Sequence, residues 1–243
     1  DTTLVSVMAV NNEIGSIQPI HDIATLLEDR PTISFHVDAV QALAKVATEV
    51  YLPERVDFAT FSSHKFHGLR GVGFVYIKEG KKITPLLTGG GQEKEMRSTT
   101  ENVAGIAATA KALRLAMENQ EAFASKTQQM KEVIRKELAN YPDVTVFSGE
   151  DHFAPHILTF GIKGVRGEVV VHAFEEFDIY ISTTSACSSK AGKPAGTLIA
   201  MGVDKSIAQT AVRLSLDIEN DMSQVEQFLT KFKLIYEQTR KVR

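Results

Sequence analysis

Cysteine is scarce in this 243-residue sequence, which contains a single one, and that scarcity excludes an internal framework of disulfide bonds. A lone thiol suits a reducing compartment, so we expect a cytoplasmic protein. No apolar run is long enough to span a bilayer and no secretory signal peptide is visible, so we expect no membrane segment. With 27 Lys and Arg against 30 Asp and Glu, the charge gives no reason to expect nucleic acid or an anionic membrane as a partner.

Paired metal-ligand spacings are also missing. The histidines show no spacing typical of a metal site, and one cysteine does not form a thiolate cluster, so we expect no metal held by this chain by itself. Internal repeats and low-complexity tracts are absent. The length is sufficient for a substantial core in one large or two small domains.

The first 80 residues follow the rhythm of an open α/β sheet. Strands are predicted at 3–10, at 32–37, from Phe58 and at 73–77, with a helix opening at Pro19. Ligands of such sheets bind beyond the carboxyl ends of the strands. Because residue 1 is Asp and the following residues already have the pattern of an interior strand, we expect a piece of a longer chain.

The second half has a different pattern. Residues 101–141 are predicted to be helical, as two helices or one bent helix, with a domain boundary at Asn119-Gln120. Strands at 144–147, 156–160, 179–182 and 211–216, a helix at 168–177, a loop at 183–196 and a terminal helix follow. We therefore expect two domains, 1–118 and 119–243, of which the second is a smaller α+β layer.

A polar cluster ends the strand that begins at Phe58, and it reads Ser62-Ser63-His64-Lys65. Burial and neighbouring cations lower a lysine's pKa and free the amine for Schiff-base chemistry, while hydroxyls and turn amides can hold a phosphate. The alternative is a solvated Lys65 at a strand end. Asp38 ends the preceding strand and is expected to meet a cation or a ring N–H, or else to cap a helix. An acid and an amine facing one crevice form the arrangement that a pyridoxal phosphate site needs.

Four further residues are candidates for chemistry. Asn12 and Gln41 also follow strands. Cys187 lies in a polar, Gly-rich loop with two nearby lysines that favour a thiolate, although a lone cysteine is more often a buried hydrophobe. Arg213 interrupts an apolar strand, where its forked donors suit a substrate carboxylate or, as the alternative, an internal salt bridge.

Taken together, six motifs closely resemble the cysteine desulfurases of the NifS/IscS type, a class-V aminotransferase family of fold-type-I pyridoxal-phosphate enzymes. They read NNEIG (11–15), HVDAVQ (36–41), SSHKFHG (62–68), GGGQEKEMRSTT (89–100), SACS (185–188) and VRLSL (212–216). The resemblance implies an α/β fold, in which part of the large-domain sheet has helices on both faces and a smaller α+β domain follows. It also implies that the family's amino-terminal cofactor-binding loop and ring-stacking His are missing from this sequence.

The resemblance carries roles for individual residues. It implies an aldimine between Lys65 and pyridoxal 5′-phosphate, a pairing of Asp38 with the pyridine nitrogen, and a persulfide on Cys187. The remaining implied roles are as follows: Asn12 and Gln41 bond the ring oxygen, Ser62 and His64 hold the phosphate, Thr100 reaches the phosphate of the other subunit of a homodimer, and Arg213 clamps the cysteine carboxylate.

The implied activity is removal of sulfur from L-cysteine, giving L-alanine and a persulfide passed to an acceptor such as an iron–sulfur scaffold or a tRNA-thiolation enzyme. Thr99 and Thr184 stand where the family commonly has glycine, which puts the local loop geometry in question. The alternatives are another fold-type-I enzyme, such as a selenocysteine lyase or an aminotransferase, and an inactive fragment of a truncated or split polypeptide.

Overall fold

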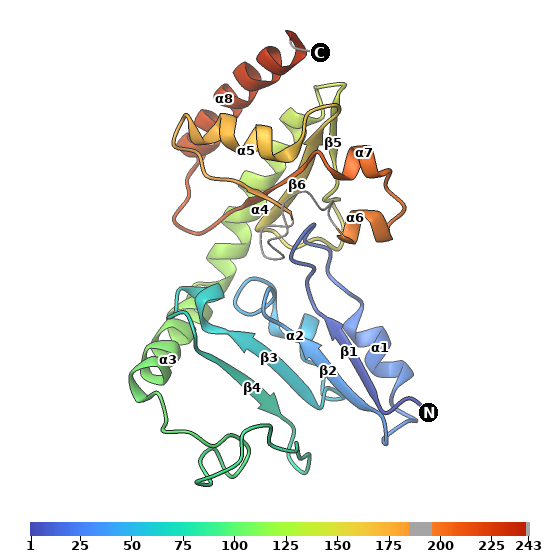
Figure 1. Cartoon of the computed structure of the whole chain (residues 1–243), viewed down its shortest axis with the longest axis vertical. Coiled ribbons are helices and arrows are strands. Elements are labelled where there is room, and N and C mark those ends of the chain that lie inside the picture. Colours follow the sequence, from blue (N-terminus) through green and yellow to red (C-terminus); the bar gives the residue numbers. More distant parts are fainter. Residues whose placement is uncertain (185–195, 242–243) are drawn as a thin grey trace. The chain divides into compact units, whose positions relative to one another are not determined.

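The computed structural model describes residues 1–184 and 196–241, and the chain forms two compact units (Figure 1). The first unit contains residues 1–9 and 18–120. The second contains residues 10–17 and the chain from Glu121 onward. The short segment 10–17 thus groups with the second unit, whereas the sequence-based division assigned all of 1–118 to the first domain.

The first unit is built around a four-stranded sheet in the order β1-β2-β3-β4 (Figure 1). β1, β2 and β3 are parallel, and β4 runs antiparallel to β3. The bounds are β1 (Leu4–Met8), β2 (Ser34–Asp38), β3 (Phe58–Ser62) and β4 (Gly73–Ile77). All four strands lie where the apolar patterns predicted them.

The helical elements of this unit are α1 (Ile20–Leu26), α2 (Thr48–Tyr51), the 3-10 turn η1 (Ser63–Phe66) and α3 (Val103–Glu118). The side chain of Asn102 begins α3 by accepting a hydrogen bond from the backbone N–H of Gly105 at 3.0 Å. α2 was not predicted, because four residues give no helical period.

The two faces of this sheet differ in burial. Side chains alternate along a strand, so Phe35 and Val37 of β2 point to one face, where both are fully buried. Leu4 and Met8 of β1 point to the other face and are 55% and 41% exposed. The apolar run at 3–10, expected to be covered on both sides, therefore has one exposed side in the described part of the chain.

The second unit contains an antiparallel sheet in the order β5-β6-β8-β7. The bounds are β5 (Val144–Val146), β6 (Ile157–Ile162), β7 (Ser182–Thr183) and β8 (Ala211–Ser215). The strand expected at 179–182 is thus mostly wrong, because only Ser182 of that range pairs with β8. The helices are α4 (Gln120–Leu138), α5 (Gly167–Glu175), α6 (Gly196–Ala200), α7 (Lys205–Ala208) and α8 (Met222–Lys241).

Every side chain of β6 is buried, because both faces of this central strand are covered. Leu158, Phe160 and Ile162 pack with side chains of α4, α5, β8 and α8 in one core. On the opposite face, Ile157 contacts Gly15 of segment 10–17, where an added Cβ would lie 2.9 Å from the Ile157 Cβ. Within the described residues, no helix has both the length and the apolar character required to cross a bilayer.

Candidate active site

Polar side chains of the first unit gather at the carboxyl ends of two neighbouring parallel strands. Asp38 is the last residue of β2 and Ser62 the last residue of β3. Asp38 pairs directly with Thr60, so the two-residue period places Asp38, Thr60 and Ser62 on the same face. Lys65 follows in η1, where it is half-buried. The carboxyl ends of the neighbouring strands β2 and β3 lie at one edge of one sheet (Figure 1). The residues at these ends supply a carboxylate, a hydroxyl and an amine.

Asp38 is exposed. Its Oδ1 accepts a hydrogen bond from the backbone N–H of Val40 at 3.0 Å and so caps the turn that follows β2. No helix directly follows Asp38, since residues 40–45 form turns, so the helix-cap alternative is wrong and the carboxylate holds a turn instead. Gln41 lies in the same turn and is half-buried.

His36 supports the same face of the sheet. The imidazole bridges two strands, because Nδ1 lies 2.7 Å from the Ser6 hydroxyl and Nε2 lies 3.1 Å from the Thr60 hydroxyl. Partial burial lowers the pKa of His36 and outweighs the opposite effect of the Asp38 charge. The ring is therefore neutral at pH 7. The sequence analysis missed this role, although the two-residue period already places His36 on the face of Asp38.

Ser63 and Ser62 have different environments despite being adjacent. Ser63 is fully buried, and its hydroxyl is hydrogen-bonded to the hydroxyl of Thr109 in α3 at 2.9 Å. Its carbonyl accepts the N–H of Gly68 at 2.9 Å, and an added Cβ at Gly68 would lie only 1.8 Å from the Ser63 hydroxyl oxygen. The Ser63 hydroxyl is therefore engaged in contacts within the fold, whereas the Ser62 side chain lies on the same face of the sheet as Asp38.

His64 and Thr100 are both exposed. His64 lies in η1, directly before Lys65. Thr100 lies in the long connection between β4 and α3, three residues before the first residue of that helix. Both positions leave the side chain accessible to a ligand or to another subunit.

In the second unit, the turn at residues 11–15 is held by the sheet. Three successive carbonyls accept hydrogen bonds from side chains: Asn12 from Nη1 of Arg213 at 2.7 Å, Glu13 from the Thr159 hydroxyl at 2.5 Å, and Ile14 from the Ser148 hydroxyl at 2.6 Å. Thr159 and Arg213 are directly paired residues of β6 and β8. The turn that carries Asn12 and the strand that carries Arg213 are therefore fixed to each other.

The same turn also holds the start of α6. The backbone N–H of Thr197 donates to Oε2 of Glu13 at 3.0 Å, and Nδ2 of Asn11 donates to the Thr197 hydroxyl at 3.2 Å. Oδ1 of Asn11 accepts the N–H groups of Glu13 and Ile14. The Asn11 side chain is thus part of the turn itself, which favours Asn12 as the ligand-binding member of the pair. Sequence reasoning missed the role of Glu13.

A buried lysine supports the other side of this turn. Nζ of Lys131 donates to the carbonyl of Ala154 at 2.8 Å, and the N–H of Ala154 donates to the carbonyl of Gly15 at 2.7 Å. The Lys131 side chain lies in α4 and its residue is only 2% exposed. Burial, with a smaller contribution from Arg135, lowers its pKa to about 8.

Cys187, the predicted nucleophile, lies outside the described residues. Thr184, which immediately precedes the undescribed segment, is buried. Thr197 stands two positions after that segment, at the start of α6.

Comparison with known proteins gives a consistent result. Residues 1–228 match the aminotransferase class-V family. The whole chain is 51% identical to a NifS/IcsS protein homolog of Lactobacillus delbrueckii subsp. bulgaricus, of which it covers 63%, and 38% identical to a cysteine desulfurase IscS of Clostridium botulinum, of which it covers 61%. A solved NifS-like protein superposes with a TM-score of 0.87 at 36% identity, over 97% of this chain and 61% of that one.

The chain therefore spans about three fifths of the length of these relatives. The match extends over almost all of the present sequence, including both units. These similarities, together with the polar groups at the ends of β2 and β3, establish the fold type predicted from the motifs. The chain belongs to the class-V aminotransferase family, whose members are pyridoxal-phosphate enzymes.

Proposed function

We propose that this chain is part of a pyridoxal-phosphate-dependent cysteine desulfurase that converts L-cysteine into L-alanine and transfers the sulfur to Cys187. The observation that carries the proposal is the position of Lys65, in the turn directly after β3, beside a strand that ends in Asp38. The relatives named cysteine desulfurase support the choice of reaction within the family.

The donor groups of the first unit fit pyridoxal phosphate. Lys65 is half-buried and supplies the amine that holds the aldehyde carbon. Asp38 supplies a carboxylate for the pyridine nitrogen, and Gln41 supplies an amide for the ring oxygen. Ser62 and His64 supply a hydroxyl and an imidazole for the phosphate, since the hydroxyl of Ser63 is already bonded to Thr109. When bound, this cofactor supplies an electron sink for charge on the α-carbon of an amino acid.

Residues of the second unit act on the substrate in this proposal. Arg213 binds the substrate carboxylate with donors of its guanidinium, whose Nη1 is held by the Asn12 carbonyl. Asn12 adds a side-chain amide for the ring oxygen. The free amine of Lys65 would move the α-proton of cysteine.

Cys187 takes the sulfur. Its thiolate forms a sulfur–sulfur bond with the substrate, and the carbon–sulfur bond of cysteine breaks. The electron pair of that bond remains on carbon, which takes up a proton, so that L-alanine leaves and a persulfide stays on Cys187. The persulfide is then passed to an acceptor protein, such as an iron–sulfur scaffold or a tRNA-thiolation enzyme.

The proposal includes a cytoplasmic homodimer. Thr100 lies in an exposed connection and would reach the phosphate bound by the other subunit. A change of Thr100 to Ala is expected to weaken cofactor retention, measured by equilibrium dialysis, without abolishing the reaction of Lys65 with the cofactor. If Thr100→Ala retained the cofactor as wild type does, this role would be wrong.

The central experiment separates cofactor binding from sulfur transfer. Purified protein is mixed with pyridoxal phosphate and L-cysteine, and alanine and sulfide are measured with a reductant present. Lys65→Ala is expected to lose the visible chromophore that borohydride reduces. Cys187→Ser is expected to keep the chromophore and lose sulfide release. Formation of a keto acid in place of alanine, or full sulfide release by Cys187→Ser, would contradict the proposed reaction.

A further inference from the structure

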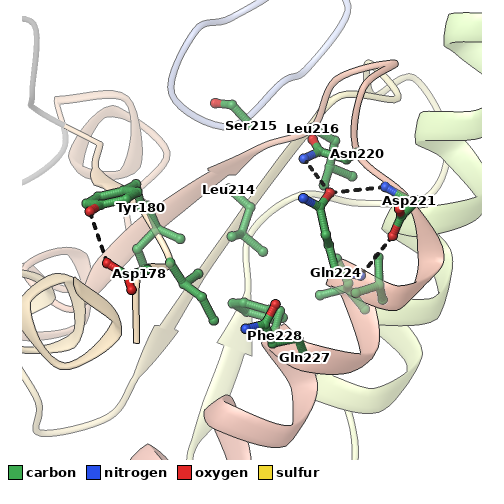
Figure 2. A pocket seen from close by; sticks show the side chains of 14 residues that line it. Asp178, Tyr180, Leu214, Ser215, Leu216, Asn220, Asp221, Gln224, Gln227 and Phe228 are labelled. Atoms are coloured by element: carbon green, nitrogen blue, oxygen red, sulfur yellow. Dashed lines mark hydrogen bonds between the residues drawn. The ribbon is translucent and has the colours of Figure 1, made fainter. Parts of the chain in front are cut away.

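A cavity of about 300 Å³ opens in the second unit (Figure 2). It lies where β7 and β8 stop pairing. Ser182 pairs with Arg213, but the chain before β7, at residues 178–181, forms no strand with the end of β8. Side chains of α4 and α8 also line the cavity between these two segments.

The floor of this cavity is apolar. Leu214, Ile134, Val225 and Phe228 contribute to it, and all four side chains are buried members of the core. A ligand with an aliphatic or planar apolar part would therefore gain from contact with this surface.

The rim is polar and negatively charged. Asp178 and Tyr180 lie on one side, and Asn220, Asp221 and Gln224 lie on the other (Figure 2). The two aspartates are the only charged residues among the fourteen that line the cavity. A cation is the charge that complements this rim.

The carboxylate of Asp221 is fixed in place. Its Oδ1 accepts the N–H of Gln224 at 3.0 Å and the hydroxyl of Ser223 at 2.6 Å, at the start of α8. The Ser223 hydroxyl and the Gln224 N–H lower the pKa of Asp221, so the group is ionised at neutral pH. Its charge therefore persists over the physiological range.

Tyr180 offers a further contact. Its residue is 77% exposed, and its hydroxyl donates to Oδ1 of Asp178 at 3.4 Å. An exposed aromatic ring beside a carboxylate is a surface on which a planar guanidinium stacks while it donates to the acid. An ammonium lacks the planar part of that interaction.

We propose that this cavity binds an arginine side chain presented by a segment of a partner protein. The aliphatic stem contacts Leu214 and Phe228, the guanidinium stacks on Tyr180 and donates to Asp178, and the charge of Asp221 on the opposite side of the rim adds to the attraction. An arginine within a chain suits the site better than free arginine, because the free amino acid carries a carboxylate of its own into the neighbourhood of two aspartates. This inference is independent of the proposed desulfurase activity.

The test uses N-acetyl-L-arginine amide, which has a guanidinium and no carboxylate. It is titrated into the ¹⁵N-labelled chain, and the side-chain amide signals of Asn220, Gln224 and Gln227 are followed by NMR. We expect these signals to shift, and the neutral citrulline analogue to produce no saturable shift. Free L-arginine and the corresponding lysine amide are expected to bind more weakly.

The matched variant is Asp178→Asn combined with Asp221→Asn. Asparagine retains the Oδ1 acceptor at the start of α8, and it tolerates the left-handed backbone at Asp178, whose φ is 57°. We expect affinity to fall by about tenfold or more. The control, Glu226→Gln with Glu237→Gln, removes the same charge from exposed positions of α8 outside the cavity. Equal affinity of the citrulline, lysine or free arginine probe, or unchanged affinity of the paired asparagine variant, would overturn the proposal.

Discussion

Replacing Lys131 with Met is expected to change how the stability of the second unit depends on pH. The ammonium of Lys131 is held inside the unit by the Ala154 carbonyl and lies 5.7 Å from the centre of the Phe153 ring. Burial lowers its pKa from 10.5 to about 8. This difference corresponds to about 3 kcal/mol by which burial disfavours the charged form.

The sign follows from proton binding. Between about pH 8 and 10.5 the unfolded chain binds this proton and the folded chain has released it, so stability rises with pH in that window. From about pH 7 to about pH 9.5, the two pKa values give a gain of about 2 kcal/mol in the free energy of unfolding. Lys131→Met retains the apolar stem and has no proton to lose, so this gain disappears.

The assay is urea unfolding at a series of pH values, followed by circular dichroism and checked for constant slope with denaturant. The informative quantity is the difference in the free energy of unfolding between wild type and variant as a function of pH. The contributions of the other titrating groups are the same in both proteins and cancel in this difference. Lys136→Met is the matched control, since Lys136 lies in the same helix and is exposed. Parallel pH curves for wild type and Lys131→Met would refute the reasoning.

Three shorter predictions concern the turn at residues 11–15, the η1 turn after β3, and the sheet of the first unit. Glu13→Ala removes the acceptor of the Thr197 N–H and is expected to lower the free energy of unfolding by about 1–2 kcal/mol and to reduce turnover. Glu13→Gln keeps an acceptor, so its losses in both quantities are expected to be smaller. Equal losses for the two variants, measured by urea unfolding and by alanine formation, would argue against the contact. Gly68→Ala forces a methyl against Ser63 and is expected to cost about 1–3 kcal/mol, measured by thermal unfolding, and an unchanged melting temperature would contradict it. For Asp57, burial raises the pKa, but hydrogen bonds and the neighbouring cations lower it by more, so the net pKa is below its usual value. The stability that Asp57 contributes is therefore present above about pH 3.8 and is lost as the pH falls. In an acid titration, the stability of Asp57→Asn should decline less steeply than that of wild type, and identical declines would count against the assignment.

Most elements of the fold were predictable because they carry a period. The apolar runs of β1 to β4 and the helical spacing of α8 are signals within one stretch of sequence. The short helices α2, α6 and α7 have four or five residues each, too few for a period to emerge. The strand expected at 179–182 failed for a different reason: it lies at the sheet edge, where pairing beyond Ser182 depends on how two segments diverge and not on their composition.

The position of the candidate site at the carboxyl ends of β2 and β3 was also predictable, whereas the hydrogen bonds that support the turn at residues 11–15 were not. Asp38, Ser62 and Lys65 follow strands in the sequence, and parallel strands end at the same edge of a sheet. The hydrogen bonds that hold the turn at residues 11–15 come from Ser148 and Thr159, which are more than 130 positions away. No local pattern in the sequence relates such residues, because only the folded sheet brings them together.

The adjacent serines at 62 and 63 show where a physical rule decides between two identical side chains. Side chains alternate along β3, which places Ser62 on the face of Thr60 and Asp38. Ser63 begins η1, so the two neighbouring hydroxyls have different surroundings. Ser62, two residues after the partner of Asp38, lies on the face of the proposed cofactor site, and Ser63 is buried against Thr109 and Gly68. Ser62→Ala should therefore weaken phosphate binding without lowering stability, whereas Ser63→Ala should lower stability by about 1–2 kcal/mol, since it leaves the Thr109 hydroxyl without this partner. Cofactor titration and thermal unfolding of the two variants test the assignment, and the reverse pattern would show that the hydroxyls have exchanged roles.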